Sequence, residues 1–269
     1  MKAGRLPVIS LLTDFGTADY FVGAVKGAIL SVNPHAVIAD ITHEIAPQDI
    51  LAGAFTLLAA YKTFPAGTIH VAVVDPGVGS TRRPIIVRAN EQFFVGPDNG
   101  LFTYIYDRER AEVFHVTAEK YFRRDPSTTF HGRDIFAPVA AALSTGVKAR
   151  EFGPMIDDAV RLPDSLEPEK LKNGDIRARI IHIDRFGNCV TNITREFVGS
   201  NATLVINRKT IREFRNFYGE DSSDTPFAIW GSAGFLELSV SGGSAAKVLK
   251  AKRNDELVLP QRRKDAKKK

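Results

Sequence analysis

The first half of the chain alternates short apolar runs with segments whose apolar residues recur at helical spacing. Residues 7–12, 37–41 and 69–74 have the continuous hydrophobicity of buried strands. Residues 19–30, and the segment after the potential helix cap Asp49, instead repeat their apolar side chains every three or four positions. Strands that alternate with helices are typical of βαβ units. The pattern predicts an α/β domain with a mainly parallel sheet flanked by helices.

The second half of the chain follows a different pattern. A helix over about 133–145, with an expected kink at Pro138 and an end at Gly146, closes the first half. Beyond it, short strand-like runs alternate with Gly, Asn and Ser, which indicates a smaller antiparallel β-domain of barrel type. These runs are residues 176–183, 203–206, 227–230, 235–240 and 256–259.

These patterns divide the chain into four segments. We expect an N-terminal α/β domain over 1–160, a linker over 161–174, a C-terminal β-domain over 175–261 and a disordered basic tail over 262–269. The tail RRKDAKKK holds six of the 36 basic residues and one of the 31 acidic residues, so the net charge of +5 arises there. Because such a tail is more often a solvated end than a binding segment, we expect no nucleic-acid partner.

Cysteine content and the length of the apolar runs bear on the location of the protein. The chain has one cysteine, Cys189, which excludes an internal disulfide and a cysteine-based metal cluster. The N-terminal residues lack the apolar stretch of a signal peptide, and no apolar run is long enough to span a bilayer. The sequence therefore predicts a cytoplasmic protein with no membrane partner.

Three acidic residues, Asp14, Asp40 and Asp75, end strand-like runs of the first domain. The carboxyl ends of parallel strands meet at one edge of a sheet, where ligands bind. Each of these residues can instead cap the turn or helix that follows it. A metal site is the weaker interpretation, because the set lacks the close His and acid spacing of a metal centre, and His43 beside Glu44 more often forms a structural hydrogen bond.

Asp75 also belongs to a set of an acid, a cation and a base held in glycine-flanked turns. Asp75 and Arg82 lie in VVDPGVGSTRRP, and His131 lies in TTFHGRD. Such a set can activate a water molecule as a nucleophile, although an Arg–Asp ion pair with a capping His is the structural alternative. The glycine-rich turn lacks the endings of a phosphate-binding loop and of a dinucleotide site. There is no GxSxG sequence, and Cys189 lies in a strand-like run that favours a buried thiol.

Eight blocks of sequence, in order over about residues 8–260, resemble the S-adenosylmethionine hydroxide adenosyltransferases, relatives of the bacterial fluorinase and chlorinase. The blocks are LLTDFG, DYFVGAVKG, ITHEIAPQD, VVDPGVGSTRR, FVGPDNGLFT, TFHGRDIFAP, IDRFGNCVTNI and GFLELSVSGGSA. The resemblance implies hydrolysis of S-adenosyl-L-methionine (SAM) to adenosine and L-methionine. A water-derived hydroxide would attack C5′ of the ribose, with SAM as the substrate and no cofactor.

The resemblance also implies roles for individual residues. Asp75, Arg82 and His131 match the hydroxide-generating set, although Arg83 competes with Arg82 as the partner of Asp75. The implied substrate contacts are Asp14 for the ribose hydroxyls, Thr129 and Phe130 at the reaction centre, Phe186 and Asn188 for adenine, Asp184 for the methionine ammonium group and Ser232 for the methionine carboxylate. Core packing is the alternative interpretation of the two phenylalanines.

Two departures separate this chain from its halogenating relatives. Residues 87–100 pass directly from one strand-like run to the next, where those enzymes carry an inserted loop, and those enzymes lack the Asp and His of the water-activating set. Both departures favour water over halide. Ala233 replaces an Arg of the fluorinase, which weakens the case for tight methionine anchoring.

The alternative functions are a halide-using 5′-halo-5′-deoxyadenosine synthase and a non-catalytic sensor of SAM or adenosine. The resemblance further implies a homotrimer with active sites at the subunit interfaces.

Overall fold

The computed structural model describes residues 6–163, 166–199, 202–220 and 223–261. The chain divides into two compact units, Met1–Asp164 and Ser165–Lys269. No helix in the described part of the chain is long and apolar enough to cross a membrane. The basic tail predicted over 262–269 lies outside the described residues.

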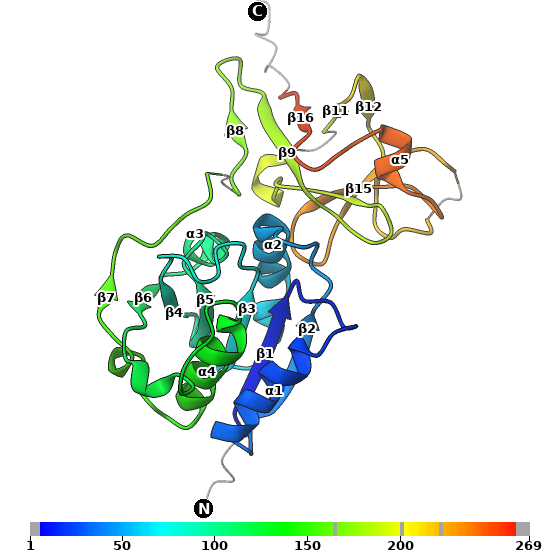
Figure 1. Ribbon diagram of the computed structural model, residues 1–269. Helices are drawn as coiled ribbons and strands as arrows, with labels where there is room; N and C mark the ends of the chain where they lie inside the picture. Colours follow the sequence, from blue (N-terminus) through cyan, green and yellow to red (C-terminus); the bar gives the residue numbers. More distant parts are fainter. Residues whose placement is uncertain (1–5, 164–165, 200–201, 221–222, 262–269) are drawn as a thin grey trace, which may run out of the picture. The chain divides into compact units, whose positions relative to one another are not determined.

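The first unit is built on a seven-stranded sheet with the order β2-β1-β3-β5-β4-β6-β7 (Figure 1). Its strands are β1 (Val8–Thr13), β2 (Val37–Thr42), β3 (Ile69–Val73), β4 (Pro84–Ala89), β5 (Gln92–Pro97), β6 (Glu112–His115) and β7 (Met155–Ile156). All except β4 and β7 run in the same direction, which confirms the predicted α/β class. β1 and β3 are buried on both faces, as their continuous apolar sequences indicate.

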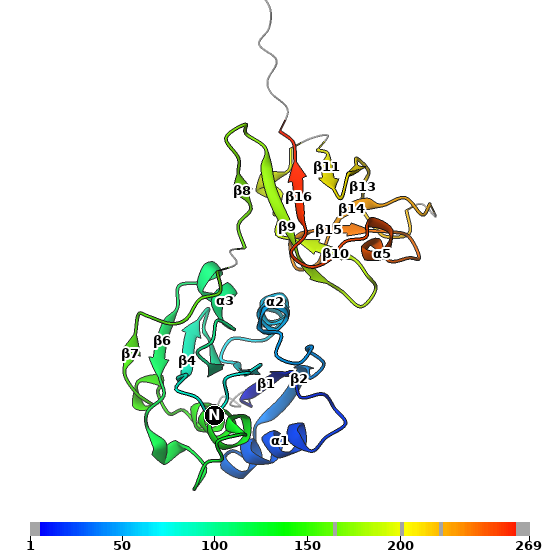
Figure 2. The same cartoon turned by 45° about the horizontal axis from the view of Figure 1, so that its top comes forward.

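Helices cover both faces of this sheet (Figure 2). They are α1 (Phe21–Val32), α2 (Ile50–Ala60), α3 (Thr103–Arg108) and α4 (Ala137–Ser144), with short 3-10 turns η1 (Tyr61–Thr63), η2 (Glu119–Tyr121) and η4 (Ala149–Glu151). α1 packs on α4 over one face, and α2 packs on α3 over the other. As predicted, Asp49 caps α2, because its carboxylate accepts a hydrogen bond from the backbone amide of Ala52.

The helix predicted over 133–145 begins differently. Residues Gly132–Phe136 form a π-helical turn, η3, and regular α-helix starts only at Ala137. Pro138 lies in the first turn of α4, immediately after this π-helical turn, and the kink expected at this residue stays a prediction. The π-helical turn begins immediately after His131, and such turns often occur at functional sites.

The second unit is a nine-stranded, mainly antiparallel sheet with the order β12-β11-β16-β9-β10-β15-β14-β13, and β8 pairs with β9 outside this path. Its elements are β8 (Glu169–Lys170), β9 (Ile176–Ile183), β10 (Cys189–Thr191), η5 (Arg195–Phe197), β11 (Leu204–Ile206), β12 (Lys209–Ile211), β13 (Phe214–Arg215), β14 (Phe227–Trp230), β15 (Leu236–Ser239), α5 (Ala245–Leu249) and β16 (Glu256–Leu259). The smaller β-domain is thereby confirmed as a fold class, and one pair, β13 with β14, is parallel.

The segment 161–174, which we expect to be a linker, contains the short strand β8 near its end. β8 pairs with β9, and a tight turn joins them in which Gly174 adopts φ +93°. The backbone amide of Leu171 donates to the carbonyl oxygen of Asp175 across this turn. Both residues of β8 are exposed, so the segment has no hydrophobic alternation by which a strand is recognised in sequence.

Candidate active site

The first candidate site lies at the carboxyl end of β3, where two loops meet. Asp75 follows β3 by two residues, and the loop after it turns at Gly79 with φ +78°. A β-carbon at Gly79 would lie 2.3 Å from the carbonyl oxygen of Thr128. Only glycine therefore allows this loop to approach the segment that carries His131.

Arg82 joins Asp75 to His131. Its Nε lies 3.0 Å from each carboxylate oxygen of Asp75, and its Nη2 lies 2.5 Å from Oδ2. The same Nη2 is 2.6 Å from Nδ1 of His131. The Arg82 and Asp75 side chains are 8% and 5% exposed, so this ion pair is shielded from solvent. Such charge-assisted, forked contacts fix the positions of all three groups.

The contact with Arg82 determines the protonation of His131. A guanidinium group only donates hydrogen bonds, so Nδ1 of His131 must accept, and a neutral ring then carries its proton on Nε2. Burial and the positive charge of Arg82 both lower the pKa of His131, which favours the neutral ring. Nε2 has no protein partner among the residues that the structure describes. The ring can therefore donate a hydrogen bond from Nε2 to a water molecule.

The choice between Arg82 and Arg83, left open by the sequence, is decided by geometry. Arg83 turns to Asp98, with contacts of 2.9 and 2.6 Å, and to Asp158 at 2.8 Å. Asp98 also accepts a hydrogen bond from the backbone amide of Val160. Arg83 thus stabilises the chain near Asp158, whereas Arg82 alone of the two contacts Asp75.

Five of the predicted site residues share one pocket of about 400 Å³ in the first unit: Asp14, Asp75, Thr129, Phe130 and His131. Asp14 Oδ2 accepts a hydrogen bond of 2.8 Å from the backbone amide of Gln48, a pocket residue that the sequence did not indicate. Phe130 packs edge-on against Phe21 with ring centroids 5.2 Å apart. Phe130 is therefore both a packed residue and a wall of the pocket.

Asp40 and His43 lie apart from this pocket. Asp40 pairs with Lys26 at 2.6 Å and with Nε2 of His43 at 3.2 Å, while Nδ1 of His43 bonds the hydroxyl of Thr13 at 2.8 Å. The structural hydrogen bond expected of His43 is confirmed. Of the three acids, only Asp14 and Asp75 line the pocket. Within the described ranges, no group of three or more His, Cys, Asp or Glu side chains is placed to hold a metal ion.

Three predicted residues, Asp184, Phe186 and Asn188, line a pocket of about 530 Å³ in the second unit. The carboxylate of Asp184 accepts hydrogen bonds from the backbone amides of Phe186 and Asn188, at 2.9 and 2.8 Å, and from the Asn188 side chain at 2.9 Å. These hydrogen bonds fix the conformation of the turn over residues 184–188. The Phe186 ring is nonetheless 78% exposed, which leaves its face free for stacking.

Tyr218 also lines this second pocket, and sequence reasoning missed it. The only signal was an aromatic pair, Phe217 and Tyr218, in an otherwise polar segment. Ser232, predicted to bind the methionine carboxylate, is exposed in the turn between β14 and β15 and does not belong to the lining of this pocket. Its assignment stays a prediction.

Cys189 lies in β10 and is fully buried. Burial, with smaller effects of nearby acids, raises the pKa of its thiol to about 12. The thiol is therefore unreactive at neutral pH, and the interpretation as a buried thiol is confirmed.

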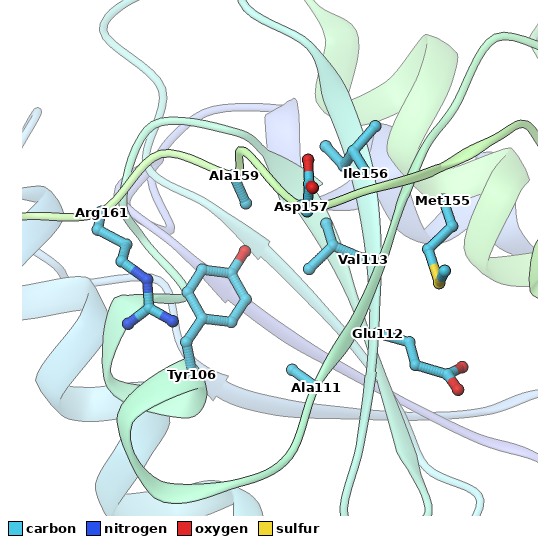
Figure 3. Close-up of a pocket in the computed structure, with 9 residues that line it drawn as sticks. All are labelled: Tyr106, Ala111, Glu112, Val113, Met155, Ile156, Asp157, Ala159 and Arg161. Carbon is cyan, nitrogen blue, oxygen red and sulfur yellow. The ribbon is translucent and has the colours of Figure 1, made fainter.

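A third pocket of about 380 Å³ lies in the first unit beside α3, β6 and β7 (Figure 3). The Tyr106 ring forms one wall, and the guanidinium group of Arg161 lies 5.1 Å from its centroid. None of the predicted site residues lines this pocket. The predicted site residues that line a pocket are therefore found in the first and second pockets.

Comparison with known proteins places these sites in a family. Models of the N-terminal and C-terminal domains of SAM hydroxide adenosyltransferases match residues 9–153 and 178–258. The (R)-S-adenosyl-L-methionine hydrolase of Methanocaldococcus jannaschii is 37% identical over 96% of this chain and 98% of its own, and a fluorinase of Nocardia brasiliensis is 28% identical over 71% and 73%. A crystal structure of a conserved protein from Thermotoga maritima superimposes with a TM-score of 0.87 and 33% identity, over 94% of this chain and 100% of that one. The chain belongs to the SAM hydroxide adenosyltransferase family.

Proposed function

We propose that this protein hydrolyses SAM to adenosine and L-methionine by attack of a water oxygen on C5′ of the ribose. The observation that carries the proposal is the Asp75–Arg82–His131 cluster, which adjoins a pocket with Asp14, Thr129 and Phe130. Four relatives named (R)-S-adenosyl-L-methionine hydrolase, 35–37% identical over at least 90% of this chain, support the same reaction.

In this proposal the cluster first holds the attacking water. Nε2–H of His131 donates to the water oxygen, and the Asp75 carboxylate accepts one of its protons. Arg82 fixes the positions of Asp75 and His131 relative to each other through its contacts with both. Holding the water in line with the breaking bond removes most of the entropy cost of the encounter.

The bond changes are those of a direct displacement. An oxygen–carbon bond forms at C5′ while the carbon–sulfur bond breaks, and its electron pair returns to sulfur. The leaving group is the neutral thioether of methionine, so no acid is needed to protonate it. One proton of the attacking water passes to Asp75 and then to solvent, and the other remains on the new hydroxyl of adenosine. Charge is dispersed as the partly negative oxygen meets the sulfonium, so a pocket with little water favours the reaction.

The substrate contacts divide between the two units. Asp14 is assigned to the ribose hydroxyls, with Thr129 and Phe130 beside the reacting carbon. Phe186 and Asn188 are assigned to adenine, and Asp184 and Ser232 to the ammonium and carboxylate groups of methionine. We also propose a homotrimer whose neighbouring subunits bring these contacts together, on the resemblance to the family. Loss of activity on dilution, followed alongside mass by light scattering, tests this assembly.

Water is favoured over halide as the nucleophile for two reasons. β4 and β5 are joined by a two-residue turn, Asn90 and Glu91, both with positive φ, so this hairpin has no inserted loop. Asp75 and His131, the residues of the water-activating set, also lie with Arg82 in one cluster. A free, buried Cys189 accords with a reducing compartment, and we propose a cytoplasmic location that cell fractionation can test.

Incubation of the purified protein with SAM in heavy-oxygen water, without and with excess chloride, tests the proposed function. Adenosine that carries the label at its 5′ oxygen in both samples is the expected product, detected by mass spectrometry. Formation of 5′-chloro-5′-deoxyadenosine would establish the halogenase alternative. Intact SAM that remains bound to the protein would establish the sensor.

A further inference from the structure

Glu237 is a buried acidic residue of the second unit that the proposed reaction does not use. It lies on β15 between β10 and β14 and is only 8% exposed. No basic side chain of the described residues forms an ion pair with it. A carboxyl group buried in this way costs stability unless its hydrogen bonds compensate. Its contacts are therefore informative about what it does.

The contact that reaches the second pocket is with Tyr218. The Tyr218 hydroxyl donates to Oε2 of Glu237 at 2.9 Å, while its ring is half exposed and lines the pocket with Phe186. Burial and the neighbouring carboxylate raise the pKa of Tyr218 to about 12, so the hydroxyl remains a donor at neutral pH. A half-exposed ring on a surface segment is free to rotate away unless its far end is held.

The other oxygen of Glu237 lies against the backbone of Gly231. A β-carbon at Gly231 would be 1.8 Å from Oε1, so any larger residue there would displace the carboxyl group. Gly231 also opens the turn that carries Ser232, and its amide donates to the carbonyl oxygen of Phe235. The carboxyl group is thus held between the tyrosine and this turn.

We propose that Glu237 is a positioning residue that holds the Tyr218 ring as a fixed wall of the pocket that Phe186 also lines, and that this pocket receives a planar purine ring. The identity of that ring as adenine rests on the proposed function. Glu237 itself acts through Tyr218 and does not touch the substrate. Its loss therefore weakens binding of the nucleoside and leaves the rate of the chemical step unchanged.

The test measures adenosine affinity by calorimetry, together with KM and kcat for SAM, in variants of both residues. Glu237→Ala and Tyr218→Phe each remove the same hydrogen bond and should weaken adenosine binding and raise KM by about ten-fold at constant kcat. The double variant should bind adenosine no more weakly than either single variant does. Glu237→Gln keeps an acceptor oxygen and should recover most of the affinity.

A second hydrogen bond between a tyrosine and a partly buried glutamate provides a control. The Tyr61 hydroxyl donates to Glu109 at 2.7 Å in the first unit, outside the first and second pockets. Glu109→Ala should lower the melting temperature and leave adenosine affinity unchanged.

Additive losses in the double variant, or a lower melting temperature of Glu237→Ala with unchanged adenosine affinity, would overturn the role of Glu237. Adenosine binding that follows the expected pattern in a protein that does not turn over SAM would support Glu237 and reject the hydrolase. Turnover of SAM with adenosine affinity unaffected in every variant would reject the role of Glu237 alone.

Discussion

The two pockets that contain predicted site residues differ in how their side chains are held. In the first unit, Asp75 and Arg82 are almost fully shielded from solvent and are locked by forked hydrogen bonds that extend to His131. In the second unit, the Phe186 and Tyr218 rings stand 78% and 48% exposed. Charged groups that are already fixed in position stabilise a transition state well, because they need not reorient when charge develops on the reacting atoms. Open aromatic faces serve the binding of a planar ring, to which stacking contributes whatever its substituents.

The difference predicts that variants of the first pocket lower kcat and variants of the second raise KM. Acid should also affect the two units unequally, because His70, a fully buried histidine whose pKa is lowered by its burial, belongs to the first unit. Four experiments examine this contrast.

The largest effect is expected from Asp75→Asn. Asparagine keeps the shape of the side chain but removes the charge that Arg82 holds and the proton acceptor, so kcat should fall by about a thousand-fold. Asp98→Asn, which removes the negative charge that the neighbouring Arg83 contacts, should leave kcat within about two-fold while lowering stability. Steady-state kinetics on folded samples measures kcat of both variants. Similar losses of kcat in the two variants would contradict the separate roles of Arg82 in catalysis and Arg83 in stability.

Acid should destabilise the first unit before the second. Burial lowers the pKa of His70 from 6.5 to about 4, so the unfolded chain takes up a proton below pH 6.5 that the folded unit refuses. The stabilisation is fully present above pH 6.5 and is lost as pH falls to about 4, a total of about 3 kcal/mol.

Urea unfolding at pH 7 and at pH 4.5 measures this acid effect. Trp230, the single tryptophan, reports on the second unit by fluorescence, while circular dichroism reports on both. The midpoint by circular dichroism should fall further than the midpoint by fluorescence. In His70→Asn the dependence on pH should be weaker, and an equal fall by both probes in the native protein would contradict the expected order.

His131→Ala should lower kcat by about a hundred-fold, because the water loses the donor that orients it. The pH profile provides the finer test. Burial and Arg82 lower the pKa of His131, so the neutral ring persists below its ordinary value of 6.5, and activity of the native protein should decline only below that pH. A decline centred above pH 6.5 would mean that the protonated ring is not the inactive form.

The smallest effect is expected from Phe186→Ala. Loss of one stacked ring should raise KM by about ten-fold and leave kcat unchanged. Phe217→Ala is the matched control, because Phe217 is 58% exposed beside Tyr218 but does not line the pocket. A fall in kcat for Phe186→Ala would show that the second pocket takes part in the chemical step.

Local sequence predicted most of the secondary structure. The β9, β14 and β16 strands match the predicted ranges, and the cap at Asp49 starts α2 where its sequence indicates. Short apolar runs and helix caps are properties of neighbouring residues, so they can be read along the chain. The β8 strand and the π-helical turn before α4 were not predictable in this way. β8 consists of two exposed residues, and the residues of the π-helical turn have the same spacing of apolar side chains as the helix that follows.

The sequence by itself determined the two-part architecture, the family and the residue types that carry the candidate chemistry. The tertiary structure alone decided which of them meet: Arg82 rather than Arg83 reaches Asp75, Asp40 turns away to Lys26, and Tyr218 joins the second pocket. Arg82 and Arg83 are adjacent and identical in type, but Arg82 contacts Asp75 and His131 whereas Arg83 contacts Asp98 and Asp158. Contacts between distant residues depend on loop geometry, such as the close approach at Gly79, which no local pattern encodes.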